Sequence, residues 1–126
     1  MEGIADRLGA QALAGFELEL GDIGAFKRSR LVRVVWLGLR SGGDAAGALA
    51  AKVEAECGAA GLEADQRAFT AHVTLARARH RDGADLPTLP EVPQLGPWRA
   101  AQLVLFSSHL SKAGAVHEPI RIVPLK

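Results

Sequence analysis

Residues 32–39, with the sequence VRVVWLGL, are almost all apolar and rich in β-branched side chains. A run of this kind is typical of a central β-strand. Before it, residues 16–20 (FELEL) alternate apolar and charged side chains, which is the period of a half-buried strand. Residues 21–30 contain glycines and basic side chains and are predicted to be a connection. We therefore expect a sheet built around residues 32–39.

Helices are predicted on both sides of these strands. Residues 4–13 form a short helix that ends near Gly15. Asp44 is a suitable N-cap for a second helix over residues 44–60, and Gly61 is a suitable stop. This second helix has one apolar stripe, whose members are four positions apart and predict the face that packs on the core: Leu49, Val53 and Cys57.

The second half of the chain adds further strands. Residues 69–76 (FTAHVTLA) and 101–107 (AQLVLFS) are each predicted to be strands, and residues 120–125 an edge strand. Residues 81–97 contain four of the six prolines and are predicted to be an extended loop. The order of elements indicates an α+β fold, a mostly antiparallel sheet with flanking helices, in a single domain over residues 1–126.

Composition narrows the class of protein. Apolar residues make up 48% and charged residues 23%, which excludes a disordered tail, and no apolar run approaches the ~20 residues of a membrane helix. The net charge of +1 argues against a general nucleic-acid coating protein. A single cysteine, Cys57, provides neither an internal disulfide nor metal-ligand spacing. We expect a cytoplasmic protein with no metal and no cofactor.

Basic side chains are unevenly distributed. Four lie between Lys27 and Arg33, and another cluster runs from Arg77 to Arg81. Either cluster could contact a few phosphates, or could be a solvated surface loop.

His72 and Thr74 are the side chains most suited to chemistry. Alternate side chains of a strand share a face, so these two point one way, and we expect Val73 and Leu75 to form the buried side. A histidine titrates near neutral pH and can give or take a proton, and a threonine hydroxyl can donate to a phosphate oxygen. The pair suits phosphoryl chemistry, although an H-x-T triplet also occurs in ordinary strands.

Arg77 is the candidate for neutralising charge on phosphoryl oxygens. Strict alternation places Arg77 on the Val73 face. It reaches the His72 face only if the strand ends or twists after Ala76.

The surroundings of His72 resemble a known family. The run FTAHVTLAR, residues 69–77, is similar to the motif F-x-P-H-[LIV]-T-L-x-R of the 2H phosphoesterases, specifically of the RNA 2',3'-cyclic phosphodiesterases, also called 2'-5' RNA ligases. Residues 16–26 resemble the family's F-x-L-x-L-x-G-x-G-x-F segment, and residues 34–38 its R-V-L-W-L-G strand. Residues 103–108 resemble the strand before its final hairpin. Ala71 departs from the family's proline.

The resemblance implies a fold and a reaction. The fold has two lobes, each providing one H-x-[ST] strand to a central cleft, and the reaction opens a 2',3'-cyclic phosphate at an RNA end to leave a 2'-phosphate without a metal. By the same resemblance, His72 is one of two catalytic histidines, Thr74 and Arg77 bind the phosphate, and a weak 2'-5' ligase activity is implied. The partner is an RNA with a cyclic phosphate end, or a cyclic nucleotide.

The family's first H-x-[ST] motif does not occur in residues 1–126, which correspond to the C-terminal two-thirds of the family fold. We expect it in a coding segment before Ile4. Among the other histidines, His117 corresponds to a family position near the substrate edge, His109 spells H-x-S in a predicted turn, and His80 is expected in solvent.

Two alternatives to this enzyme remain open. In the first, the chain is a non-catalytic fragment that binds RNA ends and retains one phosphate-holding motif. In the second, two copies of the chain form a homodimer in which their two His72 side chains complete one cleft. An incomplete lobe also predicts self-association through exposed apolar side chains, for which the candidates are Val34, Trp36 and Leu37.

Overall fold

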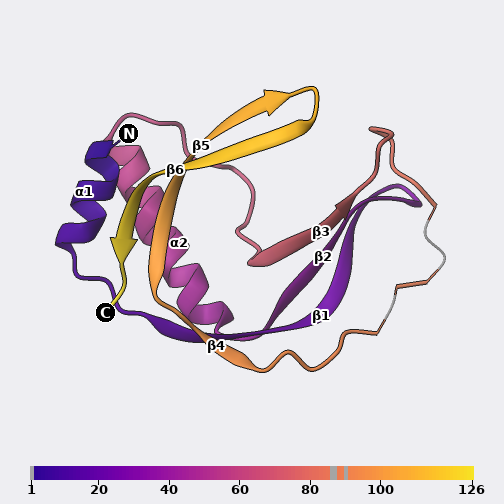
Figure 1. The fold of residues 1–126 in the computed structure, drawn as a ribbon, viewed down its shortest axis with the longest axis horizontal. Helices are drawn as coiled ribbons and strands as arrows, with labels where there is room; N and C mark the ends of the chain where they lie inside the picture. Colours follow the sequence, from indigo (N-terminus) through magenta and orange to yellow (C-terminus); the bar gives the residue numbers. More distant parts are fainter. Residues whose placement is uncertain (1, 86–87, 90) are drawn as a thin grey trace. The chain divides into compact units, whose positions relative to one another are not determined.

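The computed structural model describes residues 2–85, 88–89 and 91–126 (Figure 1). In chain order the elements are α1 (Glu2–Ala10), β1 (Phe16–Arg28), β2 (Leu31–Ser41), α2 (Gly43–Ala59), β3 (His72–Arg77), β4 (Pro97–Ala100), β5 (Gln102–Ser111) and β6 (Gly114–Pro124). One sheet has the order β3-β2-β1-β4, and β5 pairs with β6 in another. The pairs β1–β2, β2–β3 and β5–β6 are antiparallel, and the predicted α+β class is confirmed.

Packing divides the chain into two compact units. Unit 1 consists of residues 1–16, 48–67 and 99–126, and unit 2 of residues 17–47 and 68–98. The single-domain assignment stays a prediction. Neither described helix has the length and apolar character that crossing a bilayer requires.

Unit 1 has a core in which α1 packs against β6. Ile4 and Leu8, one turn apart on α1, are buried together with Leu13 and the C-terminal Val123 and Leu125. The predicted stripe of α2 packs against this core, as its spacing indicated: Leu49, Val53 and Cys57. The backbone of Lys126 bonds in both directions to the segment after α1, accepting from the Gly15 N–H at 2.6 Å and donating to the Leu13 carbonyl at 2.8 Å.

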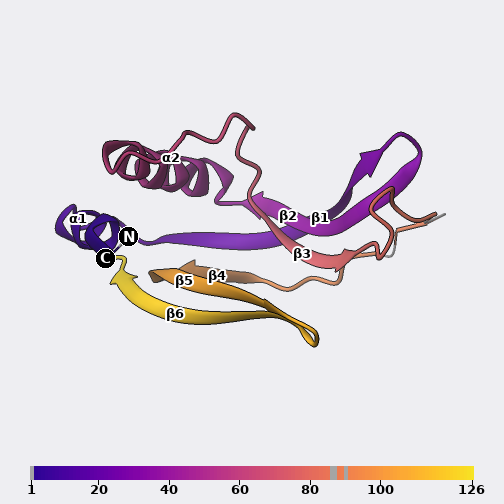
Figure 2. The same ribbon diagram turned by 90° about the horizontal axis from the view of Figure 1, so that it is seen from above.

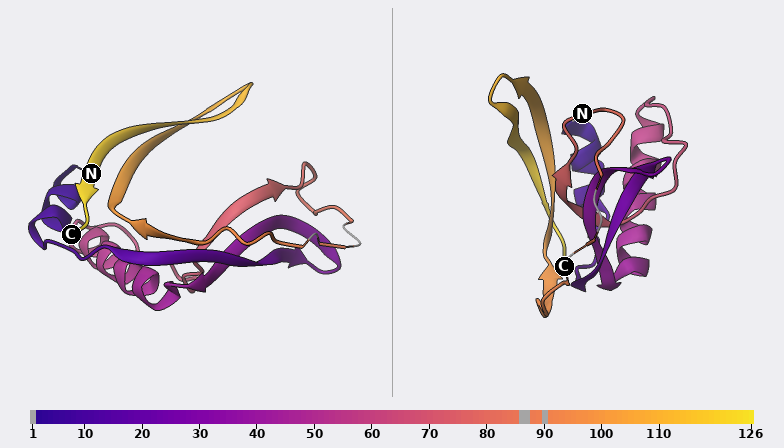
Figure 3. Two further views of the ribbon diagram at one scale, coloured as in Figure 1. Left: turned by 60° about the horizontal axis from the view of Figure 1, so that its bottom comes forward. Right: turned by 90° about the vertical axis from the view of Figure 1, so that its right-hand side faces the viewer.

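The hairpin of β5 and β6 is longer than predicted (Figure 3). Its register runs from Gln102 opposite Pro124 to Ser111 opposite Gly114. The triplet at residues 109–111 therefore lies in a strand, and the predicted turn there is wrong. Both strands are longer than the segments that alternate apolar and polar residues. Hydrogen bonds to the paired strand outweigh the local propensity of the additional residues.

In unit 2, β2 is an inner strand with β1 on one side and β3 on the other, as the apolar run at residues 32–39 predicted (Figure 2). Val32, Val34 and Leu37 of β2 are buried. The proposal that Val34 and Leu37 form an exposed apolar surface is therefore wrong, and Trp36 is half-buried. Large exposed apolar side chains lie on the β5–β6 hairpin, with Phe106, Leu110 and Ile122 among them, and others lie in unit 2. Self-association stays a prediction.

Two predictions about the strands of unit 2 need correction. Residues 21–28 are part of β1 and not a connection, because they pair with β2 through register shifts, one of which leaves Asp22 unpaired at a φ of 39°. Val73 and Leu75 are 46% and 52% exposed and do not form a buried side. The reason is that β3 is the edge strand of its sheet. The described part of residues 81–97 is mostly loop, as predicted, although it ends in β4.

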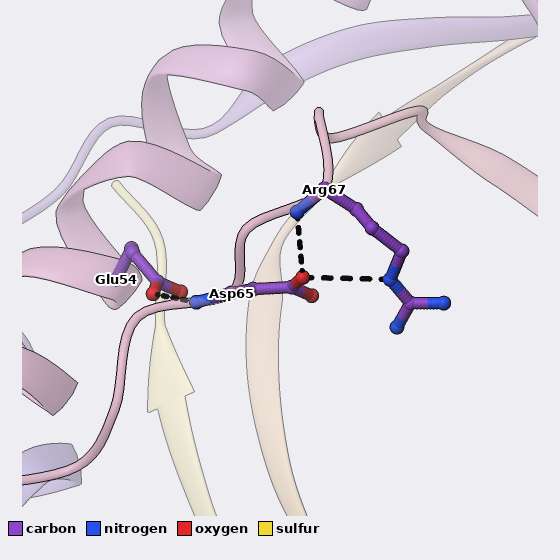
Figure 4. A network of polar contacts seen from close by, with 3 residues as sticks. All are labelled: Glu54, Asp65 and Arg67. Carbon is purple, nitrogen blue, oxygen red and sulfur yellow. Dashed lines mark hydrogen bonds and ion pairs between the residues drawn. The ribbon is translucent and has the colours of Figure 1, made fainter.

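A polar network orders the segment after α2 in unit 1 (Figure 4). The backbone N–H of Asp65 donates to Glu54 on α2 at 2.8 Å, and Asp65 Oδ1 accepts from the backbone N–H of Arg67 at 3.0 Å. This backbone hydrogen bond, helped by the charge of the Arg67 guanidinium, holds the pKa of the Asp65 carboxyl below its ordinary value of 3.8.

A lowered native pKa makes the ionised carboxylate a stabilising group above the ordinary value of 3.8, and this stability is lost as the pH falls through the lowered pKa. We predict that Asp65→Asn has a lower free energy of unfolding than the wild type at pH 7, and that the difference shrinks towards zero on acidification. Urea unfolding of both proteins across this pH range measures it. A difference that grows in acid would contradict the prediction.

Candidate functional site

The pairing of β3 with β2 places the two predicted catalytic side chains on one face of the sheet. His72 lies opposite Gly38, and Thr74 lies opposite Trp36. Directly opposite residues of an antiparallel pair share a face, so His72, Thr74 and Trp36 project to the same side. Both His72 and Thr74 are exposed and therefore accessible to a substrate.

Arg77 reaches this face through a bulge. Val35 pairs with Ala76 while Trp36 pairs with Thr74, so Leu75 is an extra residue on β3. The register after the bulge sets Arg77 opposite Val34, which shares the face of Trp36. Strict alternation predicted the opposite face. The bulge therefore aligns Arg77 with His72 and Thr74.

The His72 imidazole is oriented by the backbone. Its Nδ1 lies 2.6 Å from the carbonyl oxygen of Thr70. A carbonyl can only accept, so Nδ1 carries the hydrogen and donates it. Nε2 is then the nitrogen with a free lone pair in the neutral ring, and the proton donor in the charged ring. This contact leaves Nε2 as the ring nitrogen that is free to exchange a proton.

Two aromatic rings stand beside the imidazole. The centroid of Phe26 on β1 is 5.3 Å from that of His72, with the planes at 86°. Trp36 also meets His72 edge-on, at 6.3 Å, and Phe26 and Trp36 are 5.3 Å apart. Edge-to-face contacts of this kind stabilise a defined ring orientation. Sequence reasoning missed this role for both rings, because neither residue is adjacent to His72 in the chain.

Gly24 makes room for the Trp36 indole. It lies opposite Trp36 across the β1–β2 pair, and a Cβ at this position would collide with the indole ring. The ring therefore covers the glycine backbone, in the way that aromatic side chains cover cross-strand glycines. The indole Nε1 is buried and has no hydrogen-bond partner among the described residues.

A cavity of about 340 Å³ adjoins the same cluster. It shares Trp36 with the ring cluster and Thr70 with the His72 hydrogen bond. The remaining lining comes from β1, β2, the start of α2 and the segment before β3: Asp22, Gly38, Leu39, Gly43, Gly47, Phe69 and Ala71. Within the described ranges, no three His, Cys, Asp or Glu side chains converge to hold a metal ion.

The other histidines lie elsewhere. His117 is on β6 in unit 1, where its Nδ1 is 2.8 Å from Ser108 Oγ and its ring meets Phe106. His109, on β5, is 3.2 Å from Ser107 Oγ through Nε2. His80 is exposed in the loop after β3, as expected. The substrate-edge role of His117 stays a prediction.

Known proteins resemble this chain in sequence and in fold. A family model described as the 2'-5' RNA ligase superfamily matches residues 2–112. An RNA 2',3'-cyclic phosphodiesterase from Aeropyrum pernix is 28% identical over 123 residues, covering 93% of this chain and 69% of the relative.

Solved structures agree with these sequence matches. E. coli LigT complexed with 3'-AMP superposes with a TM-score of 0.79 at 27% identity, over 98% of this chain and 68% of LigT. TT0787 of Thermus thermophilus gives a TM-score of 0.76 at 27% identity, over 98% of this chain and 67% of TT0787. The fold is thus that of the two-histidine phosphoesterases. The chain belongs to the 2'-5' RNA ligase superfamily, which confirms the family that its motifs resemble.

The packing of Trp36 over Gly24 generates a prediction about stability. We expect Gly24→Ala to lower the free energy of unfolding by about 1–3 kcal/mol, because the new methyl group forces the indole to move. Gly47→Ala on α2 is the matched control, since a Cβ there meets no atom within 4 Å, and this change should be neutral or stabilising. Equal effects of the two changes in chemical denaturation would contradict the proposed packing.

Proposed function

We propose that this chain opens RNA 2',3'-cyclic phosphate ends to 2'-phosphates by a two-histidine mechanism in which His72 is one of the two histidines. Membership of the superfamily and the similarity to an RNA 2',3'-cyclic phosphodiesterase support the reaction class. The single observation that carries the assignment of His72 is its Nδ1–H contact with the Thr70 carbonyl, which leaves Nε2 available on an exposed face shared with Thr74 and Arg77.

The reaction needs two proton transfers. A water oxygen bonds to phosphorus, the bond from phosphorus to the 3'-oxygen breaks, and the product carries a 2'-phosphate and a 3'-hydroxyl. One group takes the proton of the water, and another gives a proton to the departing 3'-oxygen. His72 Nε2 performs one transfer, and the histidine of the family's other H-x-[ST] motif, which does not occur in residues 1–126, performs the other.

The remaining residues of the face act on charge and position. The Thr74 hydroxyl donates to a non-bridging phosphate oxygen, and the Arg77 guanidinium neutralises the charge that accumulates as water attacks. Phe26 and Trp36 keep the imidazole in one orientation. Less conformational entropy is then lost when Nε2 is positioned at the phosphate. The same site would join RNA ends if the 5'-hydroxyl of a second RNA replaced water: its oxygen bonds to phosphorus, the bond from phosphorus to the 3'-oxygen breaks, and a 2'-5' linkage with a free 3'-hydroxyl results, the ligase activity that the resemblance implied.

Turnover of a 2',3'-cyclic mononucleotide tests the proposal, measured with this chain joined to a segment that carries the family's other H-x-[ST] motif. We predict that His72→Ala lowers kcat by roughly 10²- to 10⁴-fold, the typical contribution of a positioned acid or base. Thr74→Val should cost on the order of 10- to 100-fold, because a hydrogen bond to a charged oxygen is lost, and Thr74→Ser should restore most of it.

His109→Ala is the matched control and should leave turnover unchanged, since His109 lies on β5 and its ring contacts Ser107. Equal rates for the wild type and His72→Ala would remove His72 from the mechanism. A wild type that binds cyclic-phosphate RNA without turnover would favour the binding-fragment alternative.

A further inference from the structure

The basic side chains of unit 2 gather at one end of its sheet. Of the eight Lys and Arg residues in unit 2, seven lie in residues 27–33 and 77–81, and only Arg40 lies outside. All seven are exposed. We call them the basic patch: Lys27, Arg28, Arg30, Arg33, Arg77, Arg79 and Arg81.

Backbone hydrogen bonds hold the two segments of the patch side by side. The Ala78 N–H donates to the Arg33 carbonyl at 2.8 Å, and Ala84 and Val32 bond to each other in both directions at 2.8 and 2.9 Å. Residues 79–83 thus form a loop tied to β2 at both ends, and Gly83, at a φ of 108°, lets this loop lie against Leu31 and Val32. The arginines of the loop are therefore presented from a fixed backbone.

The charge of the patch is largely uncompensated. Among the described residues, only Arg28 of the seven has an acidic partner, Asp82 at 3.6 Å. The two segments themselves contain none of the seven acidic residues of unit 2. Like charges held together without partners repel one another, and a polyanion that releases its counterions on binding relieves this repulsion.

The patch meets the catalytic face at Arg77, although Arg33 is next to Val34 on β2 and projects from the opposite face. Arg77 belongs to both, and it is five positions along β3 from His72, about 16 Å at ~3.3 Å per residue. An RNA whose cyclic end lies against His72 can therefore extend its preceding phosphates along β3 to the tied loop and the β1–β2 turn.

We propose that the basic patch binds the backbone phosphates of the RNA that precede the cyclic end, so that the preferred substrate is an oligonucleotide and not a cyclic mononucleotide. This inference rests on the proposed function for the identity of the ligand. In this proposal Arg30, Arg79 and Arg81 contact backbone phosphates, and such contacts do not depend on the base sequence of the RNA.

The test compares binding of a labelled single-stranded RNA of about twelve nucleotides, ending in a 2',3'-cyclic phosphate, with turnover of the cyclic mononucleotide. Arg79→Gln/Arg81→Gln should weaken RNA binding roughly tenfold at ~0.1 M salt and lower the slope of log K against log salt by about 1.4. Turnover of the mononucleotide should be unchanged. Arg30→Gln, on the β1–β2 turn, should weaken binding independently of the loop.

Lys52→Gln/Lys112→Gln is the matched control, because it removes the same charge from unit 1. It should leave RNA binding unchanged. The proposal would be overturned if Arg79→Gln/Arg81→Gln bound the RNA with wild-type affinity, or if the control weakened RNA binding equally. Binding of polyglutamate as tightly as of the RNA would also overturn it. Mononucleotide turnover reports on the proposed function and RNA binding on the patch, so failure of one is distinguishable from failure of the other.

Discussion

The hydrogen-bond register of β2 is the constraint on which the functional face depends. On one side β2 sets Gly24 opposite Trp36 and thereby brings Phe26 to the ring cluster. On the other side it sets His72, Thr74 and Arg77 along β3 and anchors the loop that follows. A slip of one residue would send every one of these side chains to the opposite face. The apolar character of residues 32–39 thus has a functional consequence, because an inner strand resists such a slip.

The shift in the β2–β3 register also determines which side chains of β3 lie on the face of His72. The bulge at Leu75 places Arg77, which strict alternation would put on the opposite face, on the face of His72 and Thr74. It also explains why Leu75 is exposed, since an unpaired residue of an edge strand packs against few neighbours. Backbone pairing, and not side-chain preference, therefore decides which side chains of β3 share the face of His72.

Much of the fold was predictable from local patterns, and the site only in part. Periods of two or four residues are visible in the sequence itself. They predict the apolar stripe of α2 and the shared face of His72 and Thr74, and the apolar run predicts the inner strand. The length of β1, the missed β4 and the exposure of Val73 depend on partners far away in the chain, which no local window contains. The ring contacts of Phe26 and Trp36 with His72 are non-local for the same reason.

The distribution of charge along the chain is a property that the net charge of the whole chain conceals. A net charge of +1 argues against a protein that coats nucleic acid, yet it averages over a unit whose cations gather at one end and whose acids lie mostly elsewhere. Electrostatic attraction falls off over about 10 Å at ~0.1 M salt, so a phosphate responds to the nearest cluster and not to the sum. A polyanion approaching unit 2 is therefore attracted at the end of β3 where Arg77 and the loop at residues 79–83 lie. For the RNA ligand that we propose, such an uneven distribution favours the orientation that places its phosphates over the cations.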